Sequence, residues 1–168
     1  QNIQSMPDAS PTKWHRAHTT WFFEAFVLAP HLSGYRVHDA RFAYLFNSYY
    51  EGAGPRHPRA ERGKIARPDC DEVAAYRTAV DDAMEAFIAN AASDVFAHAE
   101  PLITLGLHHE QQHQELILMD ILHARGGYRE RSFTENAPSP LTWHDFSGGL
   151  VEIGTSHPDF AFDNERPR

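Results

Sequence analysis

Cysteine is almost absent from this 168-residue sequence: the single Cys70 cannot form an internal disulfide, which fits a reducing compartment. Runs of lysine or arginine are also absent, and 23 acidic against 15 basic side chains give a formal net charge of −8. This composition removes the electrostatic basis for binding nucleic acid or an anionic membrane. No apolar run approaches the roughly 20 residues that a membrane-spanning helix needs. We therefore expect a globular cytoplasmic protein that binds neither nucleic acid nor a membrane.

Four segments carry apolar residues at steps of three and four, the spacing typical of amphipathic helices. Helices are expected at about 11–28, 39–50, 70–92 and 101–125, so the sequence predicts an all-α bundle of four-helix type. The predicted buried positions are Trp14, His18, Trp21, Phe22 and Ala25 in the first helix, Phe42, Leu45, Phe46 and Tyr49 in the second, and Val73, Tyr76, Val80, Met84 and Phe87 in the third.

Local signals mark the expected helix ends. Ser10 and Pro11 form a plausible start for the first helix, because proline is favoured at the first helical position. Asp69 with Glu72 resembles a capping box before the third helix. The polar segment 51–70 is rich in proline, glycine and arginine, and its length predicts a functional or mobile loop.

Beyond residue 132 the helical pattern stops. We expect the bundle to occupy 1–132, a linker 133–147, and the first strands of a truncated second domain 148–168, with a strand at 150–153. The sequence begins without methionine and its last segment is too short to bury itself. We therefore expect a fragment of a longer protein.

Twelve histidines are a high number for this length, and two of them lie in HEQQHQEL at 109–116. His109 and His113 are four residues apart, so on a helix their Cβ atoms are about 5–6 Å apart on one face. That spacing lets two imidazoles bind one metal ion, as in the H-E-x-x-H helix of zinc proteases. The expected bundle and the lack of a further downstream ligand argue against a protease. The pair also arises by chance in a histidine-rich chain.

His18 lies in the middle of the apolar face of the first helix. It is either a core histidine or a third ligand, because bundle cores assemble metal sites from facing helices. Three neutral imidazoles with open coordination positions suit Fe(II) or Zn(II). The remaining histidines show no shared spacing with these, and we interpret them as structural or exposed. They are His15, His31, His38, His57, His98, His108, His123, His144 and His157.

Other polar residues have two readings each. Gln112 is one turn from His109 and either faces the same cavity or is a surface amide. Tyr49 and Tyr50 either pack or place a phenol near the metal. The arginines of the loop, Arg56, Arg59, Arg62 and Arg67, could bind a substrate carboxylate, although a solvated basic loop explains any one of them.

Four segments together resemble one family. SPTKWHRAHTTWFFE, LFNSYYE, HEQQHQEL and FAFDNERPR, in this order, are similar to segments of the ergothioneine-biosynthesis sulfoxide synthases. These enzymes join a DinB-like helical bundle to an α+β domain like the formylglycine-generating enzymes. Their bundle has a further helical stretch upstream, so the resemblance implies that an N-terminal helix is missing from this sequence. The resemblance implies an iron-dependent oxidoreductase that contains non-haem Fe(II). It would use O₂ to link hercynine (trimethylhistidine) to a thiol, γ-glutamylcysteine or cysteine, as a sulfoxide.

The resemblance also implies roles for individual residues. His18, His109 and His113 would be the iron ligands, in agreement with their spacing. Gln112, Arg59 and Arg62 would bind the substrates, and the catalytic residues would be Tyr49 and Tyr50. Most of the substrate pocket in the family lies in the C-terminal domain, so we expect this fragment alone to be inactive and to need the remainder of that domain.

Three alternatives stay open. A DinB-like thiol transferase would activate a small thiol on a similar three-histidine metal without O₂, although it would not need the FAFDNERPR segment. A paralogue that uses a selenium substrate would have the same residues. A purely structural metal usually has four protein ligands, often cysteines, which one cysteine does not favour.

Overall fold

The computed structural model describes residues 2–48, 52, 54–126 and 140–167. The chain divides into two units, Gln1–Tyr128 and Arg129–Arg168. The first unit is an all-α bundle, and no strand occurs in the described part of either unit. The predicted helical class is confirmed. Within the described ranges, no helix is both long enough and apolar enough to span a membrane.

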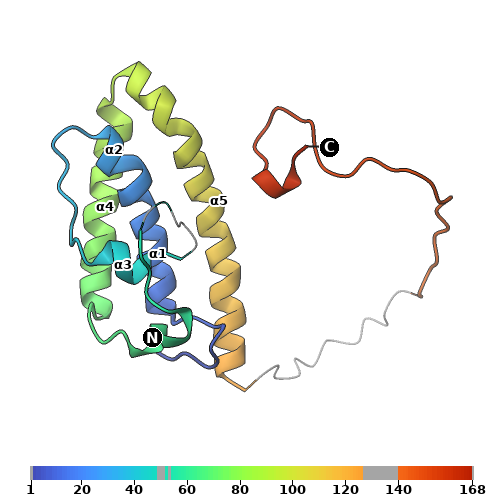
Figure 1. The fold of residues 1–168 in the computed structure, drawn as a ribbon, viewed down its shortest axis with the longest axis horizontal. Coiled ribbons are helices and arrows are strands. Elements are labelled where there is room, and N and C mark those ends of the chain that lie inside the picture. The colour runs from blue at the N-terminus through green and yellow to red at the C-terminus, as the bar shows by residue number, and fades with distance from the viewer. Residues whose placement is uncertain (1, 49–51, 53, 127–139, 168) are drawn as a thin grey trace. The chain divides into compact units, whose positions relative to one another are not determined.

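The helix α1 (Thr12–Phe23) is the centre of the bundle, with α4 (Cys70–Asn90) and α5 (Ser93–Ala124) packed on it (Figure 1). Nearly every residue of α1 is buried, as a helix covered by neighbours on several sides requires. The π-helix η1 (Glu24–Leu28) and the short α2 (Ala29–His31) extend α1 to residue 31. The run continues through Pro30 and ends at His31, three residues later than predicted.

The start of α4 forms as its sequence predicts. Oδ1 of Asp69 accepts hydrogen bonds from the backbone N–H groups of Asp71 (3.0 Å) and Glu72 (2.9 Å), and Glu72 accepts one from the N–H of Asp69 (2.6 Å). This is a complete capping box. The five apolar positions predicted to be inside are all buried, namely Val73, Tyr76, Val80, Met84 and Phe87.

The helix α5 begins at Ser93, eight residues before the predicted start at Pro101. A proline inside a helix removes a hydrogen bond and normally disfavours continuation. Here Ala99 is fully buried, and Val95 and Leu102 pack against the core on the same face. Packing of this face outweighs the unfavourable effect of a proline in the interior of a helix.

The second predicted helix is much shorter than expected. Of the described residues in this range, only α3 (Phe42–Phe46) is helical. The backbone becomes extended at Asn47, whose side chain binds the carbonyl of Gly54 (3.1 Å). The following loop contains the 3-10 helix η3 (Arg59–Lys64). It is held to α1 by Lys13, whose Nζ donates to two loop carbonyl groups at 2.7 Å each.

In the C-terminal unit the described residues form only the 3-10 helix η4 (Asp163–Glu165). The strand expected at 150–153 is absent, and Leu150, Val151 and Ile153 are exposed. A strand needs a neighbour to satisfy its backbone hydrogen bonds, and the described residues supply none. The proposed domain boundaries remain a prediction.

Candidate metal centre

Three residues predicted to bind a metal come together where α1 contacts α5. His18 lies on α1, and His109 and His113 lie one turn apart on α5; each offers a ring nitrogen, and these nitrogens lie within 4.8 Å of one another. His18 is 2% exposed and His113 is 8% exposed. The predicted juxtaposition is confirmed, and these residues could hold a metal ion.

Close contact between α1 and α5 depends on Gly106. A Cβ atom at this position would lie 2.5 Å from a ring carbon of Phe23 and 3.0 Å from one of Phe22. Both rings are buried, so they have little room to move. The absent side chain therefore lets α5 approach α1 one turn before His109.

His18 is fixed in orientation by the backbone. Its Nδ1 lies 2.5 Å from the carbonyl oxygen of Phe46. A carbonyl only accepts, so Nδ1 carries the proton and Nε2 keeps its lone pair, which faces the cluster. The Trp14 indole stacks on this imidazole at 4.6 Å between centroids, and the Arg62 guanidinium lies 3.4 Å from the centroid of the Trp14 ring.

His109 has one ring nitrogen near His18 and one without a hydrogen-bond partner among the described residues. Its Nδ1 is buried and has no hydrogen-bond partner in the described part of the chain, while its Nε2 lies 3.1 Å from Nε2 of His18. Two nitrogens bound at about 2.1 Å to one ion at a right angle are about 3 Å apart. The pair thus has the separation of neighbouring metal ligands, and the donor set fits a divalent ion.

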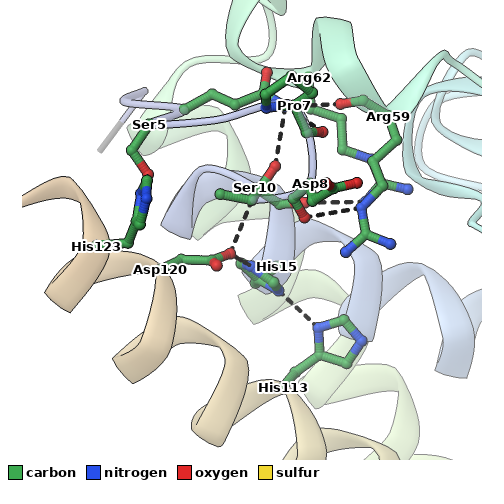
Figure 2. Close-up of polar contacts among 12 residues, drawn as sticks. Ser5, Pro7, Asp8, Ser10, His15, Arg59, Arg62, His113, Asp120 and His123 are labelled. Atoms are coloured by element: carbon green, nitrogen blue, oxygen red, sulfur yellow. Dashed lines mark hydrogen bonds and ion pairs between the residues drawn. The ribbon is translucent and has the colours of Figure 1, made fainter.

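The third candidate ligand, His113, is held by a second histidine. Its Nδ1 lies 2.8 Å from Nδ1 of His15, whose Nε2 lies 2.9 Å from Oδ2 of Asp120 (Figure 2). The same oxygen accepts the backbone N–H of Ser10 at 2.8 Å. This leaves Nε2 of His113 as the nitrogen available to the cluster.

Burial keeps these imidazoles neutral. Desolvation lowers the pKa of His109 to about 4. Desolvation, with repulsion from His109, His15 and Arg62, lowers the pKa of His113 to about 3. Desolvation, with repulsion from both other cluster histidines, holds the pKa of His18 well below its usual 6.5. Neutral imidazoles are the form that binds metal ions, so the site is ready for a cation near neutral pH.

The formal H-E-x-x-H match does not extend to protease chemistry. Glu110 forms an ion pair with Arg77 of α4, which also binds Asp81. A protease of that class would use this glutamate as a general base beside the metal. Here Glu110 is engaged in an ion pair that joins α4 to α5.

The other predicted residues have different surroundings. Gln112 is exposed on α5. Arg59 is exposed and donates from Nε to the Asp8 carbonyl at 2.9 Å. Tyr49 and Tyr50 lie outside the described residues.

Arg62 is buried, in contrast to Arg59. Its two terminal nitrogens donate to the hydroxyls of Ser10 (3.0 Å) and Ser48 (3.1 Å). Substrate binding by Gln112, Arg59 and Arg62 therefore stays a prediction.

The sequence interpretation missed His15 and Asp120. His15 was assigned a structural or exposed role, but it is buried and in contact with a predicted ligand. Two signals were available: His15 lies three residues before His18, and Asp120 lies seven residues, about two helical turns, after His113. Both spacings place the residue on the face of the ligand.

No protein-family model matches this chain, and no curated protein matches it.

Proposed function

We propose that this chain carries the iron-binding bundle of an O₂-dependent sulfoxide synthase that joins hercynine to γ-glutamylcysteine or cysteine. The observation that supports this most is the convergence of three neutral imidazoles from α1 and α5. The sequence resemblance to the ergothioneine-biosynthesis enzymes supports the choice of reaction. A DinB-type bundle followed by the beginning of a second domain belongs to the same proposal.

The number of ligands favours a reactive rather than a structural metal. In the described part of the chain, no fourth histidine, cysteine or carboxylate joins the three. Structural zinc sites are usually closed by four protein ligands, whereas catalytic sites leave positions open. Three nitrogen ligands suit Fe(II), and the open positions are available to substrates.

The proposed reaction is a four-electron oxidation by O₂. The imidazole C–H bond of hercynine and the S–H bond of the thiol break, and a C–S bond forms. One oxygen atom of O₂ ends in the sulfoxide and the other in water with the two released hydrogens. Bound Fe(II) would supply O₂ activation and hold the sulfur as thiolate.

The protein residues would orient the ligands and restrict water. Phe22 packs at 5.1 Å from the ring of His109, and Trp21 lies 6.0 Å from the ring of His18. These apolar rings shield one side of the cluster and strengthen electrostatic interactions there. Holding both substrates on one centre would remove most of the entropic cost of bringing them together.

Substrate contacts complete the proposal. Arg59 and Arg62 would bind a carboxylate of the thiol substrate, and Gln112 would lie near the hercynine imidazole. Tyr49 or Tyr50 would donate a proton during coupling. The exposed position of Arg59 suits contact with a diffusible carboxylate.

The test is anaerobic reconstitution of the full-length protein with Fe(II), followed by hercynine, either thiol, and air. Mass spectrometry should detect a hercynyl sulfoxide with one of the two thiols. If metal binds but neither O₂ uptake nor a conjugate is detected, the proposal is wrong. Thiol transfer without O₂ would then identify the DinB-like transferase, and a product formed only with a selenium donor would identify the selenium-using paralogue.

A further inference from the structure

The polar contacts behind His113 form a continuous chain. It begins at the backbone N–H of Ser10, passes through the Asp120 carboxylate to His15, and ends at His113 (Figure 2). His113 and Asp120 both belong to α5, whereas His15 belongs to α1. The chain of contacts therefore crosses from one helix to the other and back.

The partners determine where the protons are. An ionised carboxylate can only accept, so Nε2 of His15 must carry a proton directed at Asp120. A neutral imidazole has one protonated nitrogen, which leaves Nδ1 of His15 as an acceptor. Nδ1 of His113, 2.8 Å away, must then donate to it. Nε2 of His113 is left with a free lone pair.

We propose that Asp120 and His15 are positioning residues that fix His113 in the tautomer whose Nε2 can bind the metal ion. This inference rests on the metal site of the proposed function. Metal-binding histidines usually donate their second N–H to a carboxylate or a carbonyl, which sets the tautomer and the ring orientation. His18 uses the Phe46 carbonyl in this way. His113 instead uses a histidine that is itself oriented by a carboxylate.

The backbone N–H of Ser10 requires that the side chain at position 120 present an acceptor toward it. One oxygen of Asp120, Oδ2, accepts both this N–H and the proton of His15. A side chain at 120 must therefore present an acceptor to Ser10, and the same acceptor then receives the His15 proton. An asparagine would turn its carbonyl oxygen to this place, so Asp120→Asn should preserve the tautomers without the charge. Asp120→Ala should lose them.

The first test needs no variant. Long-range ¹H–¹⁵N correlation NMR of the metal-free protein, labelled at histidine, distinguishes the two neutral tautomers of each ring. We expect the proton of His113 on Nδ1 and that of His15 on Nε2. A wild-type His113 with its proton on Nε2 would overturn the inference.

The second test measures Co(II) or Zn(II) affinity by competition with a chelator. We expect Asp120→Ala to bind about 10–100-fold more weakly, the usual cost of removing an outer hydrogen-bond partner of a ligand. In that variant the His113 signal should become a mixture of tautomers. Asp120→Asn should keep close to wild-type affinity and tautomers. The matched control is Glu115→Ala, an exposed carboxylate on the same helix, which should change neither readout.

The outcomes separate this inference from the proposal on which it rests. A wild-type protein that binds no divalent ion overturns both the metal site and the inference. A wild-type protein that binds the ion, with Asp120→Ala unchanged in affinity and tautomer, overturns the inference alone. Metal binding with the expected tautomers, but without a C–S product, supports the inference and rejects the sulfoxide-synthase reaction.

Discussion

Each histidine of the cluster has a different anchor, and this gives the three rings unequal roles. His18 is held by a backbone carbonyl and a stacked indole, and His113 by a second histidine. His109 has no partner for its Nδ1 in the described residues. No hydrogen bond to Nδ1 from this part of the chain fixes the orientation of His109, so a metal ion bound at its Nε2 would restrict this ring more than the other two.

Replacing His109 by alanine should weaken divalent-metal binding by at least about 100-fold, more than the roughly 10–100-fold cost of losing an outer partner. The reason is that one of only three ligands is removed. Isothermal titration with Zn(II) or Co(II) measures the change. The matched control, His108→Ala, removes the neighbouring histidine of α5, which is not part of the cluster, and should bind as tightly as the wild type. Equal losses in both variants would argue against the site.

Tyr50→Phe tests the proposed proton donor, which lies outside the described residues. If the phenol donates a proton during C–S coupling, its loss should divert O₂ toward oxidation of the thiol to a sulfinic acid. Product ratios from mass spectrometry, with hercynine and thiol both present, are the measurement. An unchanged ratio of sulfoxide to sulfinic acid would remove Tyr50 from the reaction and transfer the same test to Tyr49.

At the scale of elements, the periodic and capping signals predicted helices well where local and tertiary preferences agree. The stripe of α4 and its Asp69 cap are both confirmed. The predicted start of α5 was wrong, because burial of Ala99 outweighs the tendency of Pro101 to disrupt a helix. The predicted length of α3 was wrong, because the Asn47 side chain binds the Gly54 carbonyl across a loop. Such contacts between distant residues leave no periodic pattern in a sequence.

The cap of α4 gives a prediction of stability. Asp69→Ala should lower the free energy of unfolding by about 1 kcal/mol, since two backbone N–H groups lose their acceptor. Asp69→Asn should lose much less, because asparagine caps helices equally well. Urea unfolding followed by circular dichroism compares the two variants. If both variants unfold at the same urea concentration as the wild type, the capping box does not stabilise the protein.

The contact between α1 and α5 is tested at Gly106. Gly106→Ala should destabilise the bundle by about 1–2 kcal/mol, because overpacking against the buried Phe22 and Phe23 rings outweighs the roughly 1 kcal/mol gain in helix propensity. It should also weaken metal binding, since His109 lies one turn further along. Thermal unfolding and metal titration measure the two effects. Leu107→Ala, an exposed change on the same helix, is the control, and a Gly106→Ala protein more stable than the wild type would contradict the close packing.

At the scale of the whole molecule, the bundle brings together residues that are about ninety positions apart in the sequence. Spacing within α5 identified His109 and His113. The position of His18 on an apolar helix face made it a candidate third ligand, and the family resemblance implied the same role. The spacing of three residues between His15 and His18 places both on one face of α1, but the contact of His15 with His113 depends on how α1 faces α5. A chain of hydrogen bonds is a property of packing, and packing is what the sequence specifies least directly. The proposed C-terminal domain stays a prediction for the same reason.

Burial of several neutral histidines makes the stability of the whole bundle depend on pH. The unfolded chain takes up protons near the ordinary pKa of 6.5, whereas the folded pKa values of His109 and His113 are about 4 and about 3. The unfolded state therefore binds more protons than the folded state below pH 6.5. The contribution of these neutral imidazoles to the free energy of unfolding is complete above pH 6.5. It is lost as the pH falls toward 4 for His109 and toward 3 for His113. Each such group adds up to about 1.4 kcal/mol per pH unit to this slope.

Urea unfolding of the metal-free protein, with a chelator present, should show the loss of stability on acidification, and His109→Gln should reduce the slope by about the contribution of one group. A stability that does not change as the medium is acidified from pH 6.5 to 4 would mean that these imidazoles are not buried as neutral groups.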